Sequence, residues 1–362
     1  MNSPSIGTVD APRADNNGFD ERASPVGDPA PLVCAIVLNW NNLAATSACI
    51  QSLTDTGYPR LRIIVVDNAS TDGSAEALAA APGIEFVSNR ANLGFTGGVN
   101  AGIARAMASL ADYVWLLNSD ATAEPDVLRM LVATAERDAR IGLVSPVFHH
   151  PEHPDNKEFC LGILDPDSCV LRQTADPETA RIWCENYPGQ IVLLGTALLI
   201  RRAVLESLGG LDDRFFAYVE DVDYSLRAHQ AGFNVVAVPN AIAYHAFKTP
   251  ITDPGRCPPY LHYYMSRNYL LLWRKLPDFT FRRKATVWFL RERLAQLARI
   301  KHDRLATEAL LSGLWDGVRG VGGPYVAARR MPGMLRWLLR CNPRLLIRLM
   351  DCLRRPAHSR AA

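Results

Sequence analysis

The sequence has little of what would tie it to a bilayer or to an export route. Its longest uncharged apolar run, Ile191 to Ile200, is too short to cross a membrane, which takes about 20 residues. Met1 to Ala30 contains no apolar central stretch, so this segment does not look like a signal peptide. We therefore expect a protein of the cytosolic side.

Paired metal-binding cysteines and a large net charge are also missing. None of the eight cysteines forms a CxxC pair, which argues against a zinc ribbon. The formal net charge is only +2, so nucleic acid is not an expected partner. The charge is unevenly distributed, because from Arg274 onward 20 Lys and Arg face six Asp and Glu. The sequence thus predicts an acidic body and a strongly basic tail.

Two common nucleotide-binding fingerprints are absent. No GxxxxGK motif is present, and Gly94, Gly97, Gly98 and Gly102 do not fit GxGxxG. Residues 92–100, NLGFTGGVN, nevertheless form a glycine-rich turn that leads into a helix. Such a turn lets backbone N–H groups approach an anion or a nucleotide, or it simply needs a positive φ.

What the sequence does contain, after a polar segment 1–31 that we expect to be disordered, is an alternation of strands and helices. The apolar runs predict strands at Val33–Leu38, Arg62–Val66, Ile84–Ser88, Tyr113–Leu117 and Ile141–Val147. Helices are expected up to about Thr56, over about Val99–Leu110 and over Thr122–Asp138. Later on, short strands are expected at Val235–Val238 and Ile242–Tyr244, and a helix at Tyr263–Lys275. This order predicts an α/β protein with a mostly parallel sheet.

Short polar residues follow several of these strands, where ligands of parallel sheets bind. They are Asn39, Asp67 with Asn68, Asn92, and Asn118 with Asp120. Asp120 is either a turn residue or an oxygen ligand for a divalent cation that also contacts substrate phosphates. His245 also closes a short strand, and it is either structural or a second metal ligand.

Residues 148–190 are rich in Pro and Asp, and we expect them to form an irregular flap or insertion. The segment carries His149, His150 and His153. Pro151 and Pro154 exclude the helix that would align these rings, so we interpret them as loop histidines and not as a metal site.

The stretch 215–231, FFAYVEDVDYSLRAHQA, places acids at the start of an amphipathic helix that begins near Glu220. This is either an ordinary acidic cap or a functional pair. Because successive helical residues are rotated by about 100°, Glu220 and Asp221 cannot point the same way. One of them can then face a substrate while the other braces a loop.

The basic tail is expected to be helical. Arg336, Arg340, Arg344 and Arg348 recur every four residues and alternate with apolar groups. Such a segment lies either on an anionic membrane surface or packed as a helical hairpin on the body or in a dimer. In the helix before it, Arg267 either contacts substrate or caps neighbouring carbonyl groups.

Taken together, these motifs resemble the family-2 glycosyltransferases of GT-A fold, most closely a bacterial rhamnosyltransferase-like branch. The matching pieces are AIVLNWNN (35–42), IVVDNASTDGS (64–74), NLGFTGGVNAGI (92–103), WLLNSDA (115–121), residues 198–233 around FFAYVEDVDY, and YH (244–245). They span roughly residues 33–270.

The resemblance implies a role for each matching residue. Asn39 and Asp67 fall where the family holds the base and ribose, and Asn92 and Gly94 fall in the segment lining that pocket. Asn118-Ser119-Asp120 takes the place of the DxD motif, with Asn118 keeping an oxygen but not a charge. Asp120 and His245 are thus implied as ligands of Mg²⁺ or Mn²⁺, Asp221 as the base with Glu220 beside it, and Gly195 as a further substrate contact.

The expected activity is inverting, metal-dependent sugar transfer from a nucleotide sugar. The resemblance implies dTDP-rhamnose, with UDP-sugars next, and a saccharide or polyprenyl-linked acceptor in cell-surface polysaccharide synthesis. A nucleotide-binding half (32–147), an acceptor half (148–275) and a basic tail (276–362) that docks peripherally on the inner membrane face would make up the chain. The alternatives are a sugar-phosphate nucleotidyltransferase and an inactive scaffold of the same fold.

Overall fold

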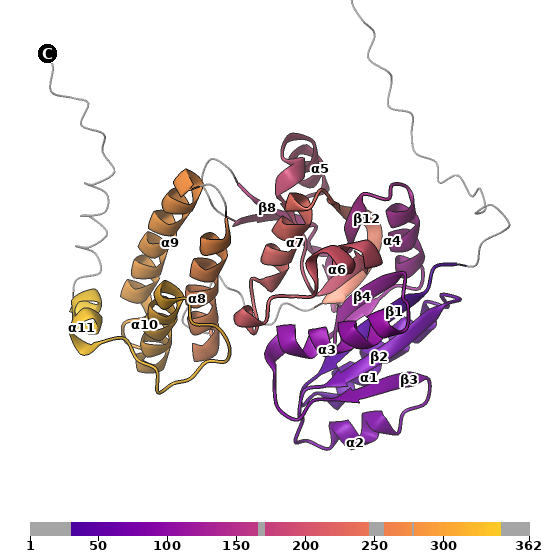
Figure 1. Cartoon of the computed structure of the whole chain (residues 1–362), viewed down its shortest axis with the longest axis horizontal. Helices are drawn as coiled ribbons and strands as arrows, with labels where there is room; N and C mark the ends of the chain where they lie inside the picture. The colour runs from indigo at the N-terminus through magenta and orange to yellow at the C-terminus, as the bar shows by residue number, and fades with distance from the viewer. Residues whose placement is uncertain (1–29, 166–170, 246–256, 277–278, 342–362) are drawn as a thin grey trace, which may run out of the picture. The chain divides into compact units, whose positions relative to one another are not determined.

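The computed structural model describes residues 30–165, 171–245, 257–276 and 279–341 (Figure 1). The expected disorder of residues 1–31 falls almost wholly outside these ranges, as do Arg344 and Arg348 of the basic stripe. The described residues belong to the compact unit that starts at Pro31, with Ala30 before it.

The strands are short and mostly buried. Their bounds are β1 Val33–Asn39, β2 Leu61–Asp67, β3 Ile84–Ser88, β4 Tyr113–Asn118, β5 Ala121–Ala123, β6 Ile141–His150, β7 His153–Phe159, β8 Leu161–Leu164, β9 Leu171–Thr174, β10 Ile191–Val192, β11 Ala197–Arg201 and β12 Asn234–His245.

Helices alternate with these strands and then close the chain. Their bounds are α1 Leu43–Asp55, α2 Ser74–Ala79, α3 Gly94–Ala108, α4 Val127–Glu136, α5 Pro177–Asn186, α6 Arg202–Leu208, α7 Glu220–Gln230, α8 Pro259–Lys275, α9 Phe279–Ile300, α10 Arg304–Arg319 and α11 Gly333–Cys341. Two 3₁₀ turns, η1 Pro188–Gln190 and η2 Asp213–Phe215, precede β10 and α7.

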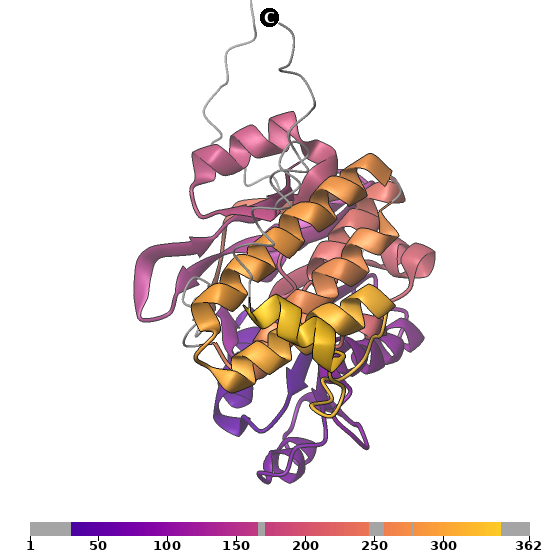
Figure 2. The ribbon, with the colours of Figure 1, turned by 90° about the vertical axis from the view of Figure 1, so that its left-hand side faces the viewer.

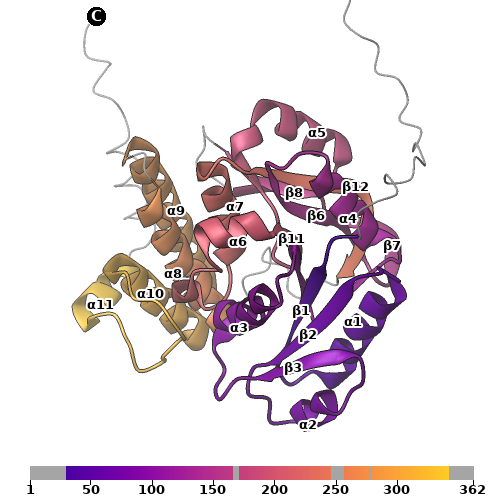
Figure 3. The same cartoon turned by 45° about the vertical axis from the view of Figure 1, so that its right-hand side comes forward.

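The central sheet has the order β3-β2-β1-β4-β11-β6-β12-β5, and β7 pairs with β6. β1, β2, β3 and β4 pair in parallel with one another, which confirms the predicted parallel α/β half. β11 runs antiparallel between β4 and β6, so the sheet is mixed. In Figure 3, α1 and α3 lie on opposite sides of β1 and β2, which explains why these strands are continuous apolar runs.

Several predicted boundaries were wrong. The helix expected over Thr122–Asp138 begins only at Val127, because residues 121–123 pair as β5 with β12. The helix expected from Val99 begins at Gly94. The two strands expected between residues 235 and 244 are one strand, β12, with a register shift between Val238 and Ile242.

The segment expected to be an irregular flap is ordered over most of its length. It contains β7, a small antiparallel sheet of order β10-β8-β9, and α5. Its apolar residues, such as Leu161 and Trp183, join the core that covers the central sheet. These strands were not predicted from the sequence, because their apolar residues are few and are interrupted by Pro and Asp.

The C-terminal helices pack on one another and on the segment around α7. α8 lies against α9 and α10, and one apolar core joins Phe215 and Val222 to side chains of all three helices. Figure 2 shows these helices, in orange and yellow, on one side of the sheet. α8 thus connects the helical tail to the acidic stretch that begins α7.

Candidate active site

The polar strand ends predicted to lie together do so. The parallel pairing of β1 sets Asn39 beside Asp67 of β2 and Leu38 beside Asn118 of β4. Asn39, Asp67 and Asn118 therefore lie at the same edge of the sheet, at the ends of neighbouring parallel strands. This is the edge at which α/β sheets bind ligands.

Asn39 and Asp67 form a buried network at that edge. Asn39 is fully buried, and its amide N–H groups donate to Asp67 Oδ1 (2.8 Å) and Ser74 Oγ (2.8 Å) while its Oδ1 accepts from Thr46 Oγ1 (2.8 Å). Asp67 Oδ2 accepts from the backbone N–H of Ser70 at 3.0 Å. Both side chains are buried and hydrogen-bonded, and their contact with base and ribose stays a prediction from the family resemblance. They fix the loops on which such a pocket would rest.

Asn68, which sequence reasoning gave no role of its own, connects that network to the glycine-rich turn. Its Nδ2 donates to Asn92 Oδ1 (3.1 Å) and to the carbonyl oxygen of Gly94 (3.0 Å). Its Oδ1 accepts from the backbone N–H of Leu93 at 3.0 Å. The signal that could have identified it is its position directly after Asp67, where a short amide can bridge two loops.

Gly94 sits at a crowded point between two halves of the chain. Its φ is +74°, and a Cβ there would lie 2.4 Å from the carbonyl oxygen of Phe216. The backbone N–H of Thr96 donates to that same oxygen at 3.1 Å. The turn therefore needs a glycine for both its φ and its space, and it is held against the segment that precedes α7.

Asp120 and His245 meet as the sequence interpretation required. The antiparallel pairing of β5 and β12 sets His245 beside Ala121, and His245 Nε2 lies 3.2 Å from Asp120 Oδ1. The Asp120 side chain is 31% exposed and that of His245 11%. Below them, burial and the charge of Asp120 raise the pKa of Cys49, so the thiol stays protonated. A carboxylate and an imidazole at this separation form a donor pair that suits a divalent cation.

Gly195 and Thr196 link the strand end of β4 to the acidic pair. The backbone N–H of Asn118 donates to the carbonyl oxygen of Thr196 at 2.8 Å. The backbone N–H of Gly195, the residue before Thr196, donates to Asp221 Oδ2 at 3.1 Å. Asp221 is thus held two hydrogen bonds away from the segment that carries Asp120.

Glu220 and Asp221 begin α7 and have different surroundings, as the rotation between them predicts. Asp221 accepts from the backbone N–H groups of Gly195 and of Val222 (2.8 Å). Burial raises its pKa, and these two hydrogen bonds oppose the rise. Glu220 is 7% exposed, and its Oε2 has no hydrogen-bond partner among the described residues. Burial and the neighbouring charge of Asp221 raise the pKa of Glu220 well above its ordinary value.

The surroundings of Arg267 do not favour the first of its two sequence interpretations, a contact with substrate. It is fully buried, and its guanidinium lies between the rings of Tyr263 and Tyr264. It donates to the carbonyl oxygens of Arg214 (3.1 Å) and Phe215 (2.6 Å). The alternative, capping of neighbouring carbonyl groups, is what the structure shows.

The three histidines of residues 149–153 lie in strands and not in an irregular loop. His150 ends β6 and His153 begins β7, with their rings stacked 5.2 Å apart. With Glu152 they bring one ligand atom each within 4.8 Å of one another, a grouping that could hold a metal ion. The tight turn between β6 and β7 brings His150 and His153 together, although the prolines of this segment exclude a helix.

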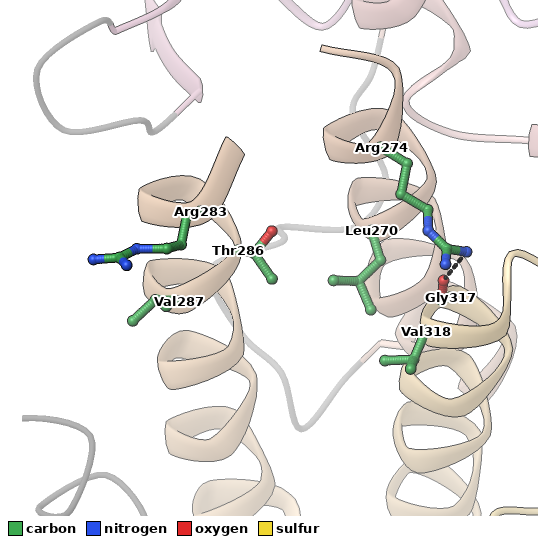
Figure 4. A pocket seen from close by; sticks show the side chains of 7 residues that line it. All are labelled: Leu270, Arg274, Arg283, Thr286, Val287, Gly317 and Val318. Carbon is green, nitrogen blue, oxygen red and sulfur yellow. Dashed lines mark hydrogen bonds between the residues drawn. The ribbon is translucent and has the colours of Figure 1, made fainter. Parts of the chain in front are cut away.

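A pocket of about 520 Å³ lies elsewhere, among the C-terminal helices (Figure 4). Its lining residues are Leu270, Arg274, Arg283, Thr286, Val287, Gly317 and Val318. None of these is a candidate site residue, so the pocket is a feature separate from the acidic pair. Among the residues of the described ranges we find no helix long and apolar enough to span a bilayer.

Comparison with known sequences agrees with the motifs. The family model for glycosyl transferase family 2 matches residues 34–209. The N-acetylglucosaminyl-diphospho-decaprenol L-rhamnosyltransferase of Mycobacterium tuberculosis is 31% identical over 212 residues, covering 53% of this chain and 69% of that enzyme. The galactofuranosyltransferase GlfT1 of the same organism is 29% identical over 204 residues, covering 55% and 65% respectively.

Solved structures support the GT-A-like fold. A mannosyltransferase from Pyrobaculum calidifontis, determined with GDP-Man and Mn²⁺, gives a TM-score of 0.52 at 18% identity and covers 90% of this chain and 85% of its own. TarS 1-349 of S. aureus in complex with UDP-GlcNAc gives 0.55 at 14% identity and covers 88% of each chain.

These matches favour sugar transfer over nucleotidyl transfer and over an inactive scaffold. The relatives are rhamnosyl- and galactofuranosyltransferases, and they align with the part of the chain that carries the predicted motifs. The chain belongs to glycosyl transferase family 2, and it is a glycosyltransferase that uses a nucleotide-sugar donor.

Proposed function

We propose that the protein transfers rhamnose from dTDP-rhamnose to a saccharide or polyprenyl-linked saccharide, with inversion and with a divalent cation. The observation that carries the proposal is the link through Gly195 and Thr196, which attaches Asp221 and the Asn118–Asp120 segment to consecutive residues. A single displacement needs the base and the leaving-group site on segments that are held together, and this link holds the two segments together. The choice of sugar rests on the rhamnosyltransferase relative.

Asp120 and His245 would hold the cation, Mg²⁺ or Mn²⁺. The donor set fits, because the carboxylate and the imidazole are already 3.2 Å apart and the carboxylate is partly exposed. Asn118 adds an amide oxygen where the family motif has a carboxylate. When bound, the cation would neutralise the charge that develops on the leaving diphosphate.

Asp221 would act as the base. Two backbone N–H groups stabilise its ionised form, whereas Glu220 lacks such donors at Oε2 and keeps its proton more readily. Asp221 would take the proton of the acceptor hydroxyl while that oxygen attacks the anomeric carbon and the nucleoside diphosphate departs. A single displacement of this kind inverts the anomeric centre.

A donor panel tests the sugar and the cation together. Purified protein is incubated with dTDP-rhamnose, UDP-galactose, UDP-galactofuranose and GDP-mannose, each with Mg²⁺, Mn²⁺ or EDTA, and release of nucleoside diphosphate is followed. We expect turnover with dTDP-rhamnose and its loss in EDTA. Turnover with another donor only would reject rhamnose, and full activity in EDTA would reject the cation.

The cation site itself is tested with Asp120→Ala. In calorimetry with Mn²⁺ present, its affinity for dTDP should fall by about tenfold or more, because one of two protein ligands is gone. Asp138→Ala, which removes an exposed carboxylate paired with Arg140, is the matched control. Equal affinity in both variants would show that Asp120 holds no cation.

A membrane surface is the second proposed partner, and α11 supplies the observation. Three of its apolar side chains face outward, with Met334 79%, Trp337 62% and Leu338 47% exposed, whereas Leu339 packs on the core of the C-terminal helices. Its Arg336 points inward and donates to Glu308 Oε2 of α10 at 2.9 Å. The helix thus rests on its own protein through Leu339 and Arg336, and its outer face keeps three large apolar groups that are available to an apolar environment.

The charge around α11 selects an anionic bilayer as its occupant. Residues 317–341 contain five arginines and no acidic residue, and Arg329 and Arg330 are exposed just before the helix. Trp337 between Met334 and Leu338 would enter the headgroup boundary while the arginines meet lipid phosphates. The tail (276–362) would thereby dock the nucleotide-binding half (32–147) and the acceptor half (148–275) on the cytoplasmic leaflet.

Vesicle sedimentation tests the docking. The full chain is mixed with vesicles of equal parts phosphatidylglycerol and phosphatidylcholine, or of phosphatidylcholine alone. The triple variant Met334→Gln, Trp337→Gln, Leu338→Gln should bind the anionic vesicles about tenfold more weakly, because its apolar insertion is lost. Leu305→Gln, which changes an exposed apolar residue of α10, is the control. Unchanged binding by the triple variant, or dimerisation that it abolishes, would reject the membrane as the occupant.

A further inference from the structure

The segment that leads into α7 has an unusual backbone. Phe216, Tyr218 and Val219 have φ values of 64°, 70° and 72°. These three are half of the six non-glycine residues with positive φ among the described ranges. Left-handed backbone is a genuine outlier for a bulky or β-branched residue, so something outside the segment must hold it.

Every carbonyl group from Arg214 to Tyr218 accepts a hydrogen bond from another part of the chain. The two N–H groups of Asn268 Nδ2 are shared among the carbonyl oxygens of Phe215 (3.1 Å), Ala217 (2.7 Å) and Tyr218 (2.7 Å). Arg267 donates to those of Arg214 and Phe215, and the backbone N–H of Thr96 donates to that of Phe216. Two neighbouring side chains of α8 therefore hold four of these five groups.

The side chains of Arg267 and Asn268 lie in the protein interior and are oriented toward this segment. Both are fully buried, and Arg267 Nε donates to Asn268 Oδ1 at 2.8 Å, which fixes the amide so that its N–H groups face the segment. Arg267 also donates to the carbonyl oxygen of Gly323, beyond α10. A buried guanidinium whose main partners are backbone carbonyl groups is an expensive device for stability alone.

The held segment ends at the acidic pair. Glu220 follows Val219 directly, and its Oε2 has no hydrogen-bond partner in the described part of the chain. Asp221 is held through backbone N–H groups, its own neighbour's among them. The direction of both carboxyl groups is therefore set by the backbone at the start of α7 and not by side-chain partners.

We infer that Arg267 and Asn268 are positioning residues for sugar transfer, which clamp residues 214–218 and thereby aim Glu220 and Asp221. The inference rests on the proposed role of the acidic pair. Loosening the clamp lets the left-handed residues relax, which turns the start of α7 and misplaces the base. A base displaced by about 1 Å costs roughly a hundredfold in rate, whereas donor binding at Asp120 and His245 is untouched.

The test compares Asn268→Ser with Tyr263→Phe. The serine variant loses the amide that reaches three carbonyl groups. The phenylalanine variant loses a buried hydrogen bond from the same helix, Tyr263 Oη to Asp316 Oδ2 (2.8 Å), and a long one from Arg267 Nη1 (3.5 Å), but it keeps the ring beside Arg267 and every bond to residues 214–218. We expect kcat to fall about tenfold or more in Asn268→Ser with the KM for the nucleotide sugar within about threefold, and both constants to stay near wild type in Tyr263→Phe.

Arg267→Lys and hydrogen exchange keep the inference testable if the first variant folds poorly. Lysine keeps the charge but cannot span the same carbonyl groups, so kcat should again fall without a matching rise in KM. The amides of residues 215–222 should exchange faster in both clamp variants than in Tyr263→Phe. Loss of thermal stability with unchanged kcat, or unchanged exchange in this segment, would overturn the inference. A wild-type protein that uses no donor of the panel would instead reject the proposed function, while the exchange result would still decide on the clamp.

Discussion

The end of β2 and the start of α7 each carry a buried carboxyl group, and the surroundings of the two groups differ. Asp67 is 1% exposed, with Oδ1 bonded by Asn39 and Oδ2 by the backbone N–H of Ser70. Glu220 is 7% exposed, with Oε2 unpaired among the described residues and its pKa raised well above the ordinary value. The first carboxyl group has hydrogen bonds to both oxygens, whereas the second has one oxygen without a partner among the described residues.

This difference separates structural polar residues from candidates for chemistry. A buried polar group costs little once its donors and acceptors are matched, so the Asn39–Asp67 network needs no purpose beyond holding loops. An unmatched buried carboxyl group beside left-handed backbone stays in a protein only when the surroundings force it. We therefore expect mutations in the first region to change stability and mutations in the second to change turnover.

The largest effect should come from Asp221→Asn. The amide keeps the volume and one acceptor oxygen but cannot take a proton, so kcat should fall by about 10²- to 10⁴-fold. Binding of the nucleotide sugar, measured by calorimetry, should persist. Asp223→Asn, two residues along the same helix, removes a carboxylate that pairs with Arg227 and Lys275 and should lower the melting temperature without a comparable loss of kcat.

If Asp221→Asn transfers sugar at the wild-type rate, the start of α7 takes no more part in the reaction than the region of Asp67 does. The proposed difference between the two regions would then be wrong. If Asp223→Asn loses as much kcat as Asp221→Asn, the effect belongs to the helix as a whole and not to one carboxylate.

A smaller effect, on stability, is expected from Asp67→Asn. The new amide would turn its NH2 toward one of the two donors, Asn39 or Ser70, and lose that hydrogen bond, so unfolding by urea should become easier by about 2–3 kcal/mol. Asp126→Asn, which changes an exposed aspartate that makes no cap hydrogen bond at the start of α4, is the control and should change stability much less. A large loss of kcat in Asp67→Asn with unchanged stability would return Asp67 to the substrate contacts that the family resemblance implies.

The sequence predicted the fold and the location of the site better than it predicted the roles of individual residues. Continuous apolar runs ended by short polar groups place Asn39, Asp67 and Asn118 at one sheet edge, because parallel strands must align their ends. The meeting of Asp120 with His245 also followed from strand ends alone, although their pairing runs through β5, which was expected to be helix.

The sequence did not show which polar side chains would find hydrogen-bond partners inside the fold. Whether Asn39 is an open donor or a buried brace depends on Thr46, Ser70 and Ser74 folding back onto it, and no periodicity encodes that. Arg267 was equally undecidable, because a buried guanidinium and a phosphate-binding one have the same local sequence. Only the positions of the carbonyl groups of residues 214–215 distinguish them.

The smallest effect concerns pH and Glu220→Gln. In wild type, burial and the charge of Asp221 keep Glu220 protonated in the folded chain to a higher pH than in the unfolded chain. Above the ordinary pKa of a glutamate the folded state thus binds more protons than the unfolded state, so the free energy of unfolding falls as pH rises. The slope from this one group cannot exceed about 1.4 kcal/mol per pH unit. Glutamine removes the proton that is exchanged, so the variant should lose less stability between acid and neutral pH.

Urea unfolding of Glu220→Gln from pH 5 to pH 8 measures this slope directly. Glu206→Gln, which changes an exposed glutamate paired with Arg202, should reproduce the wild-type slope. A residual slope in Glu220→Gln is expected from Asp221, whose pKa burial also raises, so the double change Glu220→Gln, Asp221→Asn should be flatter still. If Glu220→Gln keeps the full wild-type slope, Glu220 finds a partner in solution. It would then be as completely satisfied as Asp67, and the contrast between the two regions would rest on Asp221 alone.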